Sequence, residues 1–178
     1  MLFKDTISKE QQHQWYTSIN NNANYYFIIE IDREAAGVAY IKNIDRQKGI
    51  GEPGIFFNDI KYSDGIFPMN IGIMLIEAAF LLLALRILDS KVAKSNTPAF
   101  KFNENLGFLL MDDAGKNDFF SFKLQPLQFA KQQKIIRNAL AILHGSISEQ
   151  KIKLTLSQQE LYSVADFIDY NYFDTTIV

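Results

Sequence analysis

An almost unbroken apolar stretch from 71 to 88 constrains the fold of this chain more than any other feature. Its length is close to that of a membrane-spanning helix. However, Glu77 and Arg86 interrupt it, and neither basic residues nor an aromatic belt mark its ends. We therefore expect no membrane span, but a helix that is buried on most of its surface and lies against a sheet.

The residues before this stretch predict a helix and three strands. Ser8-x-x-Gln11 is the start of a capping box, which predicts a helix that runs to Asn20. The β-rich runs 25–31 and 36–44 predict a hairpin, turned at Asp32. A third strand is expected at 52–57, where Pro53 and Gly54 indicate a bulge or an unpaired edge.

The residues after the apolar stretch predict a compact strand, helix and strand. A strand at 89–94 leads to the pattern N-x-x-A-x-x-x-N-x-x-x-G-F, which begins at Asn96 and ends at Phe108. An Asn at the start, a Pro near the helix start and a Gly near the end are typical of a short capped helix. Strands at 108–111 and 118–124 should follow. The expected order is therefore α, β, β, β, α, β, α, β, β.

Composition and charge narrow the classes of function. The formal net charge of -2 and the scattered lysines argue against nucleic-acid binding. Because the chain has no Cys, it has no disulfide, thiolate metal site or cysteine nucleophile. The two histidines, His13 and His144, are isolated, so no metal site is expected. The N-terminus lacks the basic and apolar regions of a signal peptide, and we expect a cytoplasmic protein.

The pattern from Asn96 to Phe108 resembles the GNAT acyltransferase superfamily, which normally has Tyr where this chain has Asn103. The first helix and the hairpin are similar to those of the amino-sugar and protein N-terminal acetyltransferases in that superfamily. The resemblance covers about residues 5 to 125 and implies an α+β fold, in which helices flank a central mixed, mostly antiparallel sheet. We expect a GNAT-like core at 1–125.

Residues 126–178 exceed that core. Apolar residues at helical spacing predict a helix at 127–144, alternation predicts a strand at 151–156, and Ser157-x-x-Glu160 opens a second helix. The acidic and aromatic tail at 166–174 is expected to be the packed end of this helix. This C-terminal helix-strand-helix extension must pack on the core, on a second subunit or over the acceptor site. A homodimer through the extension is one prediction.

The resemblance implies acyl transfer from acetyl-CoA to a small-molecule amine. Residues 51–57 correspond to the strand that carries the pantetheine, which assigns Phe56 and Phe57 to coenzyme binding. Main-chain N–H groups there would also stabilise the developing oxyanion. Glu52 is the candidate base that takes a proton from the incoming ammonium. A strand-end glutamate paired with a lysine is the alternative interpretation.

The loop that would receive the pyrophosphate departs from the family pattern Q/R-x-x-G-x-G/A. Gly65 matches, but Ser63 replaces Gln or Arg, and Pro68 supplies no N–H group. Asp64 adds a negative charge beside the expected phosphates. If Pro68 occupies the first helical position, N–H groups nearby can still donate to phosphate. The predicted phosphate contacts are Gly65, Ile66, Met69, Asn70 and Ile71.

Two positions in the Asn96 pattern complete the predicted site. The resemblance assigns Asn96 to both the catalytic and the coenzyme-binding residues. Asn103 stands where the family's Tyr protonates the leaving thiolate, and a carboxamide can donate a hydrogen bond but not transfer a proton. Water, Tyr62 or another hydroxyl would have to replace it, or activity is slow or absent.

Two functions stay open from the sequence. The first is an N-acetyltransferase that acts on the primary amine of an amino-sugar nucleotide. The second is a GNAT-fold protein that lacks catalysis and serves as a binding or assembly module. Ser63, Pro68 and Asn103 favour the module, whereas Glu52 and Asn96 favour the enzyme.

Overall fold

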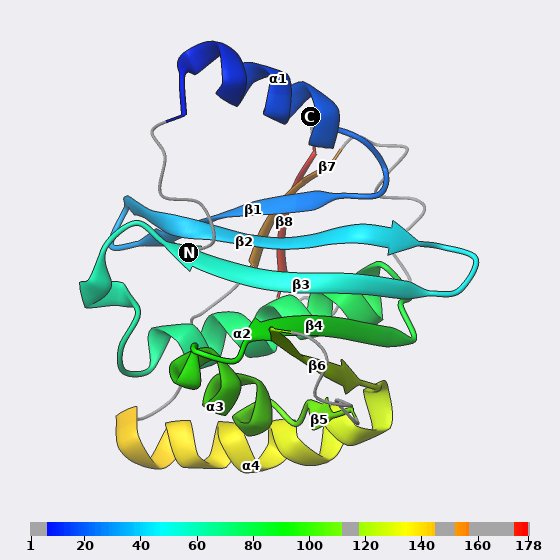
Figure 1. Cartoon of the computed structure of the whole chain (residues 1–178). Helices are drawn as coiled ribbons and strands as arrows, with labels where there is room; N and C mark the ends of the chain where they lie inside the picture. The colour runs from blue at the N-terminus through cyan, green and yellow to red at the C-terminus, as the bar shows by residue number, and fades with distance from the viewer. Residues whose placement is uncertain (1–6, 112–117, 145–151, 157–172, 178) are drawn as a thin grey trace.

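The structure, a computed structural model, describes residues 7–111, 118–144, 152–156 and 173–177. A six-stranded sheet in the order β1-β2-β3-β4-β6-β5 forms its centre, and only β3 and β4 pair in parallel. Figure 1 shows α2, α3 and α4 grouped together, and α1 apart from them near β1. The predicted mixed, mostly antiparallel sheet flanked by helices is confirmed.

The observed elements follow the predicted order through β6. They are α1 (Lys9–Ile19), β1 (Tyr25–Ile31), β2 (Glu34–Asp45), β3 (Ile50–Phe57), η1 (Ile60–Tyr62), α2 (Phe67–Glu77), η2 (Ala78–Leu82), β4 (Ile87–Ala93), α3 (Thr97–Asn105), β5 (Leu109–Leu110), β6 (Phe119–Leu124), α4 (Pro126–His144), β7 (Ile152–Leu156) and β8 (Phe173–Ile177).

Local sequence signals at the N-terminal part of the chain form as expected. The Ser8 hydroxyl accepts from Gln11 N at 3.2 Å, and the Gln11 side chain accepts from Ser8 N at 2.8 Å, which is the predicted capping box. The β1–β2 hairpin turns at Asp32 and Arg33, which both have positive φ, as a tight two-residue hairpin turn requires. The hairpin is confirmed.

The expected bulge lies on a different strand. Pro53 and Gly54 pair in regular register with Ile41 and Tyr40 of β2. The register shift falls instead between Lys42 and Asp45, so β2 carries the extra residue. The placement of the bulge at Pro53 was therefore wrong, whereas the unpaired edge of β3 is confirmed, since its pairing with β4 ends at Gly51.

The helix of the long apolar stretch begins before residue 71 and ends before residue 88, the limits that composition suggests. The helix α2 starts at Phe67, and its buried residues face the sheet core. It then widens into the π-helical turn η2, where Leu83 N donates to Ala78 O, five residues back, at 3.1 Å. Ala84 has φ 52°, a left-handed conformation that stops the helix, and β4 follows. The expected helical end at 88 was wrong.

The Asn96 pattern forms the predicted strand, capped helix and strand. The Asn96 side chain accepts from Ala99 N at 3.1 Å and so caps α3. At the other end, Gly107 has φ 91°, and Phe108 N donates to Asn103 O at 3.0 Å. These capping contacts account for the spacing of the pattern in physical terms.

The first part of the C-terminal extension packs on the core. Phe129 and Ile136 of α4 are buried among core residues, and the Glu77 carboxylate of α2 accepts from Arg137 Nη2 at 2.6 Å and from Gln133. The strands β7 and β8 pair in parallel. Residues 173 and 174, expected at a helix end, belong to β8, and the helix expected from Ser157 lies outside the described residues. The boundary at 125 stays a prediction.

The described residues contain neither a membrane-spanning helix nor a cluster of metal ligands. None of the helices there is long and apolar enough to cross a membrane. Within the same residues, no three His, Asp or Glu side chains come together as metal ligands.

Candidate active site

The sheet opens between β3 and β4, its only parallel pair. These strands pair with each other at Ile50–Ile87 and Gly51–Leu88. Beyond these pairs, β3 stays paired with β2 and β4 with β6, but β3 and β4 no longer pair with each other. We call the unpaired parts, 52–57 of β3 and 89–93 of β4, the splay. Because their facing edges are not joined, main-chain groups in the splay are available to a ligand that lies between the strands.

The strand register shows which groups of β3 face the splay. Asn58 N donates to Ala36 O of β2 at 3.0 Å, and main-chain groups alternate sides along a strand. The N–H groups of Ile55 and Phe57 therefore point to the splay, as does the nitrogen of Pro53. A proline is tolerated there, since no partner strand requires its missing N–H.

The two predicted pantetheine contacts therefore differ in the direction of their main-chain N–H groups. The N–H group of Phe57 faces the splay, whereas that of Phe56 faces β2. The Phe56 ring is 48% exposed. The sequence missed Ile55, whose N–H lies in the better position, because strand direction alone does not say which residues of the alternation face the partner.

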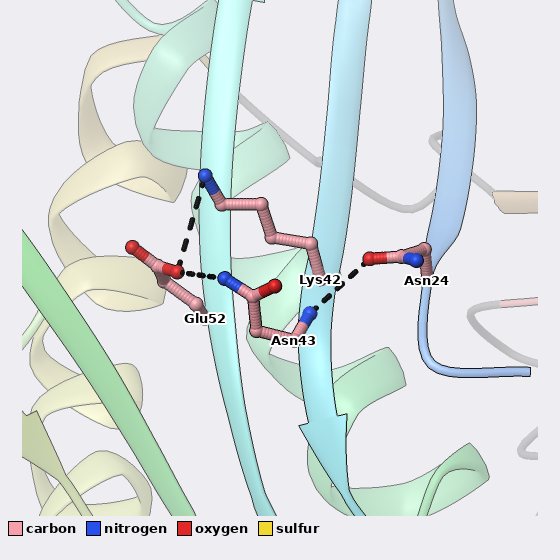
Figure 2. A network of polar contacts seen from close by, with 4 residues as sticks. All are labelled: Asn24, Lys42, Asn43 and Glu52. Carbon is pink, nitrogen blue, oxygen red and sulfur yellow. Dashed lines mark hydrogen bonds and ion pairs between the residues drawn. The ribbon is translucent and has the colours of Figure 1, made fainter. Parts of the chain in front are cut away.

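Glu52 is the first residue of β3 beyond the parallel pairs, and Figure 2 shows the contacts that hold it. Its Oε2 accepts from Asn43 Nδ2 at 2.6 Å and lies 3.9 Å from Lys42 Nζ. Asn43 has φ 54° within the β2 bulge, and its main-chain N donates to Asn24 Oδ1 at 3.2 Å. A non-glycine residue in this conformation indicates a locally imposed constraint. The bulge thus aims the Asn43 amide at the candidate base.

Glu52 shares one face of the sheet with a row of aromatic side chains. In Figure 2, Lys42 and Glu52 project from the side of the sheet opposite to the helices behind it. The strand register places Tyr26 and Tyr40 on the same side, and we define the outer face by these four residues. The Tyr26 and Tyr40 ring centroids lie 5.6 Å apart, and Trp15 of α1 meets Tyr26 edge-on at 5.7 Å. Lys42 Nζ lies 5.4 Å from the Tyr40 ring centroid.

Gly54 makes room for the Tyr40 ring on β3. A Cβ atom at Gly54 would collide with the Tyr40 ring and its hydroxyl oxygen. The ring thus extends from β2 across β3, the strand that lines the splay. Burial raises the pKa of Tyr40, and the negative charge of Glu52 raises it further. Burial also raises the pKa of Tyr26, although Lys42 acts in the opposite direction.

The sequence interpretation missed this aromatic row. A signal for it exists, since the tyrosines at 26 and 40 alternate with Phe27, which packs against the core, and with the buried residues Ala39 and Ile41. Alternation places them on the face opposite the core. Their approach to Glu52 depends on the strand register, which the sequence does not contain.

The predicted phosphate loop ends at the N-terminus of α2. Gly65 has φ 77° with open space around it, and Ile66 is the residue before the helix. Pro68 occupies the second helical position, one residue later than expected. Asn70 N donates to Ile66 O at 3.1 Å, so the helix uses the N–H groups from Asn70 onward.

The donors at this helix end are therefore fewer than predicted. The N–H groups of Phe67 and Met69 remain for a ligand, whereas those of Asn70 and Ile71 belong to the helix. The Asn70 side chain is 5% exposed and its Nδ2 has no hydrogen-bond partner. Asp64 is exposed in the loop that leads to this end.

The predicted residues of α3 have structural partners. The Asn96 side chain caps the helix, and its own N–H donates to Ala93 O at 2.8 Å. Asn103 is 8% exposed and its Nδ2 donates to Ala99 O, one turn back, at 2.9 Å. Asn96 follows the end of β4 at the open end of the splay, whereas Asn103 is directed into its own helix.

Comparisons with known proteins agree with this geometry. The family model described as an acetyltransferase (GNAT) domain matches residues 3–117. No curated protein matches by sequence.

Solved structures share the fold at low sequence identity. Spermidine N-acetyltransferase from Vibrio cholerae, in complex with CoA and spermine, has a TM-score of 0.63 and 17% identity, with 72% of this chain and 81% of that chain covered. A dodecameric structure of this enzyme has a TM-score of 0.60 and 18% identity, with 68% and 77% covered. The N-acetyltransferase PseH of Campylobacter jejuni, in complex with acetyl coenzyme A, has a TM-score of 0.56 and 23% identity, with 66% and 79% covered.

The structural matches establish the shared fold, and the family match spans well over half of the sequence. The open parallel pair, the capped α3 and the helix α2 that follows β3 occur in the order that the sequence resemblance implied. The chain belongs to the GNAT acetyltransferase family.

Proposed function

We propose that this protein transfers the acetyl group of acetyl-CoA to the primary amine of an amino-sugar nucleotide. One observation carries the proposal: Glu52 lies directly beyond the last parallel pair of β3 and β4, where the strands separate. A thioester bound along β3 would thus have a carboxylate beside it. The amine must lose a proton before it can attack, and a positioned carboxylate can accept that proton.

The splay supports binding of the donor. The N–H groups of Ile55 and Phe57 are directed where a pantetheine amide or a thioester oxygen can accept from them. The open end of the splay leads to the N-terminus of α2, where Phe67 and Met69 offer N–H groups to phosphate oxygens. Gly65 allows a close approach of the main chain, since nothing lies within 4 Å of its Cβ position.

The outer face supports an acceptor that contains rings and one amine. Aromatic side chains pack against the flat faces of sugars and bases, and Trp15, Tyr26 and Tyr40 form such a surface beside Glu52. A polyamine carries several positive charges. Lys42, 3.9 Å from Glu52, would repel a second ammonium group there.

A binding or assembly module without catalysis is the second candidate. It is favoured by the N-terminus of α2, where Pro68 removes one of the donors that a pyrophosphate would use. Asp64 adds a negative charge nearby. The two candidates differ in whether the protein binds acetyl-CoA at all.

Calorimetric titration with acetyl-CoA distinguishes the two candidates. We expect micromolar binding, and we expect Asp64→Asn to strengthen it by about twofold to fivefold, because an anion near the phosphates is removed. Glu10→Gln removes the same charge from α1, which contacts the outer face, and should leave the affinity unchanged. Absence of binding up to millimolar concentration would favour the module.

Turnover then tests the acceptor class. With acetyl-CoA as donor, we expect a UDP-linked amino sugar to be acetylated with a kcat/KM at least about tenfold above that of spermidine, as expected for one unfavourable charge contact. A preference for spermidine would show that the acceptor is a polyamine. Release of free CoA thiol measures both reactions.

We also propose that the protein forms a homodimer through the extension. Leu127, Ile135 and Ile142 of α4 are 72%, 62% and 85% exposed, and their spacing places them on one side of the helix. Sedimentation velocity should show a dimer that Ile135→Lys converts to a monomer. A wild-type monomer at the same concentration would contradict this prediction.

A further inference from the structure

The leaving thiolate needs a proton, and α3 does not supply a suitable group. Asn103 carries a carboxamide, which cannot give up a proton to a thiolate at neutral pH. Its Nδ2 donates to Ala99 O within the helix. Tyr62 lies in η1, beyond the far end of β3, where its hydroxyl is 3.5 Å from Glu34 Oε2. Neither residue is placed beside Glu52.

The β2–β3 register and the missing side chain of Gly54 place Tyr40 beside Glu52. It lies opposite Gly54 of β3, two residues beyond Glu52, and its ring crosses that strand because Gly54 has no side chain. Adjacent strands are about 5 Å apart, so a ring that crosses β3 carries its hydroxyl from β2 to the strand that borders the splay. The Tyr26 ring supports it on the other side, at a centroid distance of 5.6 Å.

We propose that the hydroxyl of Tyr40 is the group that protonates the leaving thiolate, in place of a residue on α3. This inference rests on the proposed acetyl transfer and identifies a further catalytic residue for it. Gly54 is then required for catalysis as well as for packing, since a side chain there would displace the hydroxyl.

The surroundings of Tyr40 keep its proton in place until the thiolate forms. Burial and the charge of Glu52 both raise its pKa, so the phenol stays protonated at neutral pH. Once Glu52 has taken the surplus proton of the amine, its charge no longer raises the pKa of Tyr40, and the developing thiolate can take the phenol proton.

The proton transfers balance over one turnover. Glu52 takes the first proton from the ammonium form of the acceptor and releases it to solvent before the attack. The nitrogen of the neutral amine then attacks the thioester carbonyl carbon, and the N–C bond forms as the C–S bond breaks. The surplus proton on nitrogen passes to the Glu52 carboxylate, and the Tyr40 proton passes to sulfur, so CoA leaves as a thiol. The proton on Glu52 then returns to the Tyr40 phenolate, which restores both groups.

Tyr40→Phe tests the inference, because it removes the hydroxyl and keeps the ring that contacts Tyr26 and Lys42. We expect kcat to fall about 10²-fold, while the Kd for acetyl-CoA, measured by calorimetry, changes less than about twofold. Tyr16→Phe is the matched control, since it removes an exposed tyrosine hydroxyl from α1 and leaves the strands beside the splay unchanged. Its kcat should stay within about twofold of the wild-type value.

A double variant separates catalysis from packing. If Tyr40 and Glu52 act in the same step, Tyr40→Phe combined with Glu52→Gln should be only slightly slower than the slower single variant. A Tyr40→Phe protein with wild-type kcat, or single effects that multiply in the double variant, would overturn the inference. If the wild-type protein binds acetyl-CoA but acetylates no amine, the proposed function fails first, and this inference fails with it.

Discussion

Glu52→Gln should lower kcat/KM for the amine by about 10²- to 10³-fold without weakening acetyl-CoA binding, if Glu52 is the base. Glutamine has the same shape, and its carbonyl oxygen can still accept from Asn43 Nδ2, which lies 2.6 Å from the Glu52 carboxylate. It cannot accept a proton from the amine. The loss should therefore appear in turnover, and calorimetry should give an unchanged Kd.

The pH dependence distinguishes a lost base from a distorted site. Below the pKa of the acceptor amine, the neutral fraction rises tenfold per pH unit, and the Glu52→Gln protein should recover activity in parallel. A distorted site would not recover in this way. Glu30→Gln, an exposed change on β1, serves as the control. Full activity of Glu52→Gln at neutral pH would show that another group takes the proton.

Arg137→Ala should destabilise the protein by about 2–3 kcal/mol. Arg137 Nη2 lies 2.6 Å from Glu77 Oε1, and the Glu77 side chain is 4% exposed. Gln133 and Arg137 of α4 both donate to this carboxylate. Removal of the arginine takes away the positively charged one of these two donors, while the carboxylate stays buried. The Arg137 side chain is 26% exposed, so we expect a loss at or just below the lower end of the range for a fully buried pair.

Urea unfolding provides the measurement and a direct control. Lys134→Ala removes an exposed cation from the same helix and should change the free energy of unfolding by less than about 0.5 kcal/mol. The double variant with Glu77→Gln should regain part of the loss, since no charge is then buried. If Arg137→Ala and Lys134→Ala behave alike, α4 does not depend on this pair.

The sequence predicted the parts of the fold that depend on neighbouring residues. The Ser8 capping box, the turn at Asp32 and the Asn96 cap each use groups three residues apart or closer, and their side chains form the expected contacts or turns. The order of elements followed from these signals. The end of the apolar helix could not be predicted from composition, because Ala84 takes an unusual left-handed conformation there.

The candidate site depends on contacts that the sequence does not contain. The sequence was enough to choose Glu52 as a base. Its neighbours Lys42 and Asn43, however, lie at a bulge on β2 that the sequence analysis had placed on β3. Tyr40 and Gly54 meet only through the β2–β3 register. Glu77 and Arg137 are 60 positions apart, and no local pattern links them. Catalytic roles for Asn96 and Asn103 stay predictions.

Trp15, the single tryptophan of the chain, gives the protein an intrinsic optical reporter. Trp15 is 52% exposed and its indole lies edge-on to Tyr26, on the proposed acceptor side of the sheet, while the proposed phosphate contacts lie at the N-terminus of α2. The fluorescence of Trp15 should therefore change when a ring stacks on the outer face and change little when the coenzyme binds. The order in which the two substrates bind could then be followed in one cuvette, without a label.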